Sequence, residues 1–288
     1  MGATAHTRAR EGIAAARRQV RRRPLNVPSL SLLEISKLSD TVRAAHARGE
    51  SLQGRDLAGV ALRGANLRGI DLRGAMLENA NLSGSDLTGA RCAEAILVGA
   101  CFQGAIMSEA DFGYANVSGV NAIGSHWEGA DLSDTVLDGS DFSGASLRRA
   151  RLDRCNAMQT DFQRADLSAS RCEDGDFMQA NFDDACLNDA QWHKVSMFEL
   201  RLARCNAQRV SMTQCMLAKA EGESVDLSQA CLDKSNLVQA VFPKLHAPEL
   251  RAVASSWHGC DLDGAVFDQA FLQQANFMEA RMEGASLV

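Results

Sequence analysis

The most informative feature of the chain is a five-residue alternation of apolar and polar positions. Taking Leu67 as a central apolar residue, equivalent centres fall every five residues from Leu52 to Leu287, 48 in all, with no insertion or deletion that breaks the phase. Forty of these centres are Leu, Phe, Met, Val, Ile or Trp. Amphipathic helices repeat near 3.6 residues and strands near two, so neither explains a period of five. The pattern predicts a solenoid built from many equivalent short units.

Each unit also has preferred residues beside its centre. A small residue stands two positions before most centres, and Asn or Asp often stands one before, as in Ala65-Asn66-Leu67-Arg68-Gly69 and Ala80-Asn81-Leu82-Ser83-Gly84. This motif resembles the pentapeptide-repeat family and covers residues 50–288. The resemblance implies an all-β fold, a right-handed quadrilateral β-helix with one pentad per side and four per coil. At that rate 48 pentads make about 12 coils, and a strand spacing of about 4.8 Å gives a rod on the order of 58 Å long.

Departures from the motif predict where the rod is irregular. Bulky Leu200, Leu245 and Leu250 occupy small positions, while several centres are undersized. We therefore expect distortion near residues 195–225 and 243–256, the second reinforced by Pro243 and Pro248, which cannot donate ladder hydrogen bonds. The undersized centres include Ala157, Ala207, Gly222, Ala247 and Ala252.

Glycine usage divides the rod into two halves. Two residues after the centre, Gly occupies 14 of the 20 pentads centred at 52–147 but three of the later 28. Because Gly readily adopts positive φ, this predicts type II corners in the first half and type I-like or irregular corners in the second.

The segment before the repeats is predicted to form a helical cap. Leu32, Ile35, Leu38, Val42 and Ala45 are spaced for one helical face, with Ser31 as N-cap and Gly49 as C-terminal stop. We therefore divide the chain into a flexible basic arm (1–30), a capping helix (31–49) and the β-helix (50–288). A cap would cover the unpaired backbone of the first coil. The last coil, which ends at Val288, has no predicted cap, so a homodimer could form through that end.

Charge is unevenly distributed along the chain. The net charge is −6, but residues 1–50 contain ten Lys and Arg against four Asp and Glu, which leaves −12 on the remainder. The arm could contact nucleic acid or an anionic membrane, or it could dock on the acidic rod. Its composition also superficially resembles that of an Arg-rich transit peptide. Nucleic acid is disfavoured because no aromatic residues are interleaved for base stacking. The arm arginines are Arg17, Arg18, Arg21, Arg22 and Arg23.

Catalytic and metal chemistry find little support in the sequence. The repeat phase spreads the six histidines along the rod; His126 and His246 share a side but lie six coils apart. Six of the nine cysteines face inward and the other three lie on different sides, whereas zinc needs four ligands around one point. We therefore expect no enzyme activity, no cofactor, no metal and no small-molecule substrate. The absence of CxxC pairs and of a long apolar run favours a reducing cytoplasm and no transmembrane segment.

One outward column is rich in apolar residues. Because residues 20 apart stack, the positions after the centres on one side form a column over about five coils, with Met216 in the column beside it. Adaptable Met-rich surfaces suit partner binding. Alternatively, the cap or the arm covers this column, or irregular coils turn its residues inward. The predicted partner-binding residues are Met158, Met178, Phe198, Met216 and Val238.

These features favour a non-enzymatic scaffold or adaptor with a protein partner. The junction at residues 44–57 resembles the start of the repeats in pentapeptide proteins associated with type VI secretion, which implies a secreted effector or a secretion component as partner and a role in loading or delivery. The alternative is a DNA mimic that interacts with gyrase, as some family members do. Asp141 and Asp161 stack as such a mimic requires, but Arg201 and Arg281 interrupt the same column.

Overall fold

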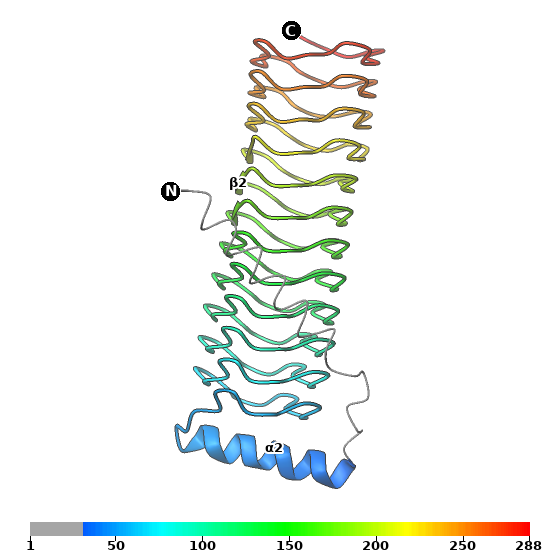
Figure 1. Ribbon diagram of the computed structural model, residues 1–288. Coiled ribbons are helices and arrows are strands. Elements are labelled where there is room, and N and C mark those ends of the chain that lie inside the picture. Colours follow the sequence, from blue (N-terminus) through cyan, green and yellow to red (C-terminus); the bar gives the residue numbers. More distant parts are fainter. Residues whose placement is uncertain (1–30) are drawn as a thin grey trace, which may run out of the picture.

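The computed structural model describes residues 31–288, which form a helix followed by a right-handed β-helical rod (Figure 1). Parallel bridges join residues 20 apart along the rod, from Asp56 with Met76 to Val266 with Ser286. The predicted fold class is therefore confirmed. We name the four sides by their central residues: side A carries 52, 72, 92 and so on, side B 57, 77, 97, side C 62, 82, 102, and side D 67, 87, 107.

The repeat is held by the same backbone hydrogen bonds in most pentads. The N–H groups of Leu67 and Gly69 donate to the carbonyls of Asp86 and Thr88 in the next coil, at 2.7 and 2.9 Å. Asp86 N–H donates to the Ala65 carbonyl of the previous coil at 2.9 Å. Within the corner, Ile70 N–H donates to the Leu67 carbonyl at 3.1 Å, and we call a corner with this hydrogen bond closed. Most ladder contacts are isolated bridges. The three named strands, β1 (Arg171–Glu173), β2 (Gln191–His193) and β3 (Ser211–Thr213), form one parallel sheet on side A.

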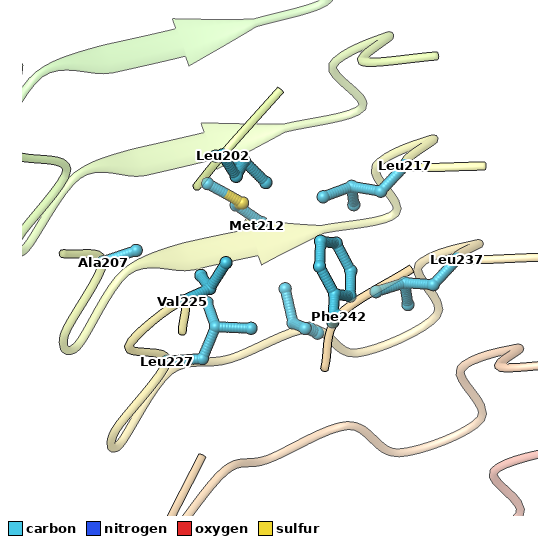
Figure 2. A pocket seen from close by; sticks show the side chains of 9 residues that line it. Leu202, Ala207, Met212, Leu217, Val225, Leu227, Leu237 and Phe242 are labelled. Carbon is cyan, nitrogen blue, oxygen red and sulfur yellow. The ribbon is translucent and has the colours of Figure 1, made fainter. Parts of the chain in front are cut away.

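The core is a column of stacked side chains. Central residues and the small residues before them point inward, and the rings of Phe142, Phe162 and Phe182 stack up side C at centroid distances of 5.5 and 4.8 Å. Figure 2 shows the interior around Leu202 and Phe242, where side chains from several sides close around a void of about 10 Å³. Gly222, which lies one coil from each of these residues, contributes no side chain there. A hypothetical Cβ on Gly222 would lie 2.7 Å from Val225, whose side chain takes up part of that space.

The expected change of corner type in the second half is wrong. The residue two after the centre has positive φ along the whole rod, whether it is Gly or not; examples are Gly124 at 60°, Gln179 at 58° and Lys219 at 56°. Positive φ at this turn position is the type II signature. The ladder imposes this conformation on side chains that normally avoid it, because their N–H groups, such as that of Gln179, donate to the next coil.

The expected distortion near 243–256 is also wrong. Leu245 and Leu250 are fully buried beside the small centres Ala247 and Ala252. In each pair the large side chain stands at the usual small position and the small one at the centre, so the total side-chain volume inside the rod stays nearly constant. Pro243 stands at the first turn position, where proline is favoured, and its carbonyl accepts a ladder hydrogen bond from Ser224 N–H at 3.1 Å.

Near 195–225 the expectation is partly right. The phase continues unbroken and Leu200 is fully buried. However, four corners lack the hydrogen bond from the N–H group that ends the corner to the carbonyl of its central residue: 192–195, 197–200, 212–215 and 222–225.

Helix α2 (Leu32–Ala47) crosses the start of the rod as the predicted cap (Figure 1). Ser31 is the N-cap of a capping box with Glu34. Val42 and Ala45 are buried, while Leu32, predicted on the same face, is 87% exposed. The buried Ser39 hydroxyl accepts a hydrogen bond from Ala61 N–H of the first coil at 3.1 Å, so the helix satisfies a backbone donor that no earlier coil can pair.

Candidate protein-binding face

The predicted partner-binding residues lie on side B in adjoining coils. We call Met158, Met178, Phe198, Met216 and Val238 the apolar strip. The position after each centre begins a corner, and the residue two before it fixes its backbone there. Asn156 Oδ1 accepts from Met158 N–H at 3.3 Å, and Asn236 Oδ1 accepts from Val238 N–H at 3.0 Å. These Asx contacts hold the backbone of Met158 and Val238 in the corner conformation.

Exposure varies along the apolar strip. Met216 is 43% exposed, while Met158, Met178, Phe198 and Val238 are partly buried by their neighbours in the column. The irregular coils therefore do not turn these side chains into the core. The strip therefore presents partly exposed apolar side chains to solvent.

A polar ladder follows one edge of the apolar strip. Gln159 Nε2 donates to Gln179 Oε1 at 3.0 Å, and Gln179 Nε2 donates to Glu199 Oε2 at 2.8 Å. Lys219 Nζ continues the ladder, 4.0 Å from Glu199 Oε1, and also lies 5.3 Å from the centre of the Phe198 ring. The cation is thus shared between a carboxylate and an aromatic face. The apolar strip is therefore bordered on one side by an ordered row of polar side chains.

The predicted basic arm, Arg17, Arg18, Arg21, Arg22 and Arg23, lies outside the described residues.

Sequence reasoning missed a second feature, a polar hollow of about 360 Å³ on side A over β1, β2 and β3. It exists because three successive corners of this side, at 172–175, 192–195 and 212–215, lack the hydrogen bond that closes most other corners. At the lower edge of the hollow, Glu173 N–H donates to Asp153 Oδ1 of the coil below, at 3.0 Å. The residues lining the hollow are Asp153, Arg171, Cys172, Glu173, Gln191, Trp192, His193, Ser211 and Thr213.

The sequence held a partial signal of these open corners. Elsewhere an Asp or Asn before the centre accepts the next N–H of the corner, as Asp161 does for Gln163 at 2.9 Å. Arg171, Gln191 and Ser211 occupy that position in β1, β2 and β3 and cannot form this Asx contact. The signal is incomplete, because the corner after Leu152 also lacks an Asx residue and is closed.

The thiol in the wall of the hollow is not a nucleophile. Burial raises the pKa of Cys172 well above its ordinary value, and its Sγ donates to the Leu152 carbonyl at 3.1 Å. Behind it, burial raises the pKa of Cys215 to about 12. Both thiols are therefore protonated at neutral pH. Among residues 31–288 no group of three or more His, Cys, Asp or Glu side chains is arranged to hold a metal ion.

The described part of the chain has no helix long and apolar enough to span a membrane. Comparison with curated protein sequences finds no match. Among solved structures, the chain resembles HetL, a pentapeptide repeat protein involved in heterocyst differentiation regulation from the cyanobacterium Nostoc sp. Strain PCC 7120. The two are 24% identical with a TM-score of 0.48 over 89% of this chain and 96% of HetL.

Two further solved structures are less similar. Full-length QnrB1, a plasmid-mediated fluoroquinolone resistance protein, is 13% identical with a TM-score of 0.23 over 81% of this chain and 93% of QnrB1. A pentapeptide repeat protein from the Arabidopsis thaliana thylakoid lumen is 22% identical with a TM-score of 0.18 over 51% of this chain and 74% of that one.

A family model described as pentapeptide repeats matches in eight copies, over more than half of the chain. The matched residues are 56–91, 77–113, 85–121, 115–156, 160–191 and 257–288. With the five-residue motif and the square coils, this match shows that the chain belongs to the pentapeptide-repeat family.

Proposed function

We propose that the protein is a non-enzymatic scaffold or adaptor that binds a protein partner through the apolar strip. Pentapeptide-repeat proteins are generally structural or interaction proteins. The observation that carries the proposal is the strip itself, a run of Met and Phe side chains that reaches the surface beside the Gln159, Gln179 and Glu199 ladder. Contiguous apolar patches with polar borders mark interaction sites, and Met side chains adapt to a partner's shape.

The finer part of the proposal concerns the partner. The junction at residues 44–57 supports a role in type VI secretion, with an effector or a secretion component as the bound protein. We propose the cytoplasm as the location, where all nine thiols would remain reduced.

The test is affinity capture from a lysate of the source organism, followed by identification of the retained proteins. The bait variant carries Met158→Ser, Met178→Ser and Phe198→Ser. A matched control carries Ile106→Ser, Ile123→Ser and Val241→Ser, which change apolar side chains of 37–39% exposure on other sides. We expect a secretion protein that the control retains and the strip variant loses. Equal retention by both variants would contradict the proposed binding face.

The gyrase-interacting DNA mimic makes a different prediction. Asp141 and Asp161 do stack on side C, but Asp161 already accepts from Asn181 Nδ2 at 3.1 Å, and Arg201 continues the column. We expect no inhibition or protection of gyrase in a supercoiling assay at micromolar protein. A clear effect in that assay would replace the adaptor proposal with gyrase binding.

The proposed homodimer has its own observation and test. Phe271 and Met278, on the last coil, are 55% and 64% exposed. A second copy packed on this coil would cover both. Light scattering should then show a dimer that Phe271→Ser with Met278→Ser converts to a monomer, and a monomeric parent protein would rule the dimer out.

A further inference from the structure

The polar hollow on side A is a local change in the architecture of the rod. Where corners are closed, a coil turns immediately after its central residue. At β1, β2 and β3 the chain stays extended for one more residue, so three parallel strands present a small flat sheet face. Arg171, Gln191 and Ser211 form one outward row of this face, and Glu173, His193 and Thr213 form the other.

The polar groups on this face are largely free to bind a ligand. His193 Nδ1 and Thr213 Oγ1 are paired at 2.8 Å. By contrast, the side chains of Arg171, Glu173, Gln191 and Ser211 make no hydrogen bond or ion pair with any residue in 31–288. This differs from the coil below, where Arg151 bridges Asp131 and Asp153 at 3.3 and 3.2 Å. Arg171 therefore lacks the carboxylate partners that Arg151 has one coil below.

The spacing of the two free charges indicates the shape of the ligand. Arg171 and Glu173 are residues i and i+2 of one strand, so their side chains leave the same face about 6.6 Å apart. An extended peptide has the same i, i+2 repeat. An acidic residue and a basic residue separated by one position would therefore meet Arg171 and Glu173 together.

We propose that the hollow binds an extended peptide segment of a protein partner with the pattern acidic, any residue, basic. The segment lies along β1, with its carboxylate on Arg171 and its cation on Glu173, while Gln191 on the neighbouring strand β2 hydrogen bonds to its remaining polar groups. The proposal rests on the scaffold role, because the ligand is a segment of a protein partner. It does not require the apolar strip to bind a partner.

Other ligand classes match the hollow less well. A neutral saccharide would leave both charges unpaired, and no aromatic face is available for a sugar ring, because Trp192 is fully buried with its Nε1 donating to Ser170 Oγ at 3.1 Å. Nucleic acid would bring phosphates against Glu173 and Asp153.

The test uses capped pentapeptides titrated against the full chain and followed by saturation-transfer NMR, which detects weak binding. The probe is acetyl-Thr-Glu-Thr-Lys-Thr-amide. A spacing control, acetyl-Thr-Glu-Lys-Thr-Thr-amide, has the same composition but directs its charges to opposite faces, and a neutral control replaces Glu and Lys with Gln. We expect the probe to bind about five-fold tighter than either control, the effect of two exposed ion pairs.

Three variants locate the site. Arg171→Gln with Glu173→Gln should abolish the preference for the probe. The charge exchange Arg171→Glu with Glu173→Arg should transfer the preference to the peptide of reversed order, acetyl-Thr-Lys-Thr-Glu-Thr-amide, because the segment keeps its direction along β1. Arg63→Gln with Glu94→Gln, which changes two exposed charges elsewhere, should leave it intact.

Equal binding of probe and controls, an unchanged preference in the Arg171 and Glu173 double variant, or displacement of the probe by maltotetraose would overturn the proposal. Met178→Ser with Phe198→Ser should leave probe binding unchanged. The experiment therefore distinguishes failure of peptide binding at the hollow from failure of partner binding at the apolar strip.

Discussion

Arg154 holds Asp134 of the coil below through both carboxylate oxygens, with Nε to Oδ1 at 2.9 Å and Nη2 to Oδ2 at 2.6 Å. Both residues occupy corner positions, yet Asp134 is only 4% exposed. The same guanidinium-over-carboxylate contact joins Arg204 to Asp184 on side C. Some corners that lack glycine thus carry ion pairs that join successive coils.

Arg154→Ala should lower the free energy of unfolding by about 1–3 kcal/mol, because it leaves the Asp134 carboxylate buried without its charged partner. Urea unfolding followed by circular dichroism measures the change. Arg149→Ala is the matched control, since Arg149 occupies a corner with φ of 56° and is exposed; it should change stability by less than about 0.5 kcal/mol. Equal losses of stability in the two variants would show that the Arg154–Asp134 ion pair does not stabilise the folded protein.

Corner residues with positive φ should respond to glycine in a predictable way. Ala169 has φ of 55°, so Ala169→Gly should raise the free energy of unfolding by about 0.5–1 kcal/mol as the backbone strain is relieved. The reverse change, Gly124→Ala at φ of 60° with open space around the new Cβ, should lower it by a similar amount. Thermal unfolding of both variants tests this, and a destabilised Ala169→Gly variant would contradict it.

The period of five predicted the fold and the inward residues, and the helical spacing of Ile35, Leu38 and Val42 predicted the capping helix, because hydrophobic patterning directly records which side chains are buried. Corner geometry could not be predicted from glycine content. The residues that replace glycine, such as Arg154 and Lys219, pay a local backbone cost that the inter-coil ladder outweighs. Local propensity therefore misleads where long-range hydrogen bonds fix the backbone.

The candidate sites were predictable to different degrees. The apolar strip follows from phase alone, since Met158, Met178 and Phe198 are 20 residues apart. The polar hollow depends on which corners open, and that depends on packing inside the rod. Trp192 donates to Ser170 of the previous coil, whereas Trp257 donates to Ser255, two residues away in its own coil. Sequence gives no direct signal of this choice.

The aromatic column should dominate stability. Phe162 is fully buried between Phe142 and Phe182, so Phe162→Ala should cost about 3–5 kcal/mol through lost burial and the cavity left behind. Phe271→Ala, which truncates a ring that is 55% exposed, should cost far less. Denaturant titration compares the two, and similar losses would argue against a continuous aromatic core.

Cysteine reactivity should follow the orientation of each thiol. Cys101, Cys186 and Cys231 are partly exposed, whereas the other six cysteines are buried. Burial also raises the pKa of Cys205 well above its ordinary value, so little thiolate is available for attack. A chromogenic thiol reagent should therefore titrate about three thiols in the native protein and nine after unfolding. Rapid reaction of more than three native thiols would show that the coils open readily.

The first coils should lose stability in acid through Asp71. This carboxylate is 7% exposed and accepts hydrogen bonds from Ser51, Arg73 and Arg91, and the Arg73 guanidinium holds its pKa well below the usual range. Because the folded pKa is depressed, the stabilisation is complete above the unfolded pKa of about 3.9 and is lost as pH falls toward the folded value.

Asp71→Asn should therefore lower the free energy of unfolding by about 1–3 kcal/mol at pH 7, and the difference from the parent protein should shrink progressively below about pH 4. Urea titrations at pH 7, 5, 3 and 2 would measure it. Asn121→Ala removes an uncharged Asx contact to Ile123 N–H, so its cost should stay constant over the same range. If the two variants depend on pH alike, the effect does not come from the ion pairs of Asp71.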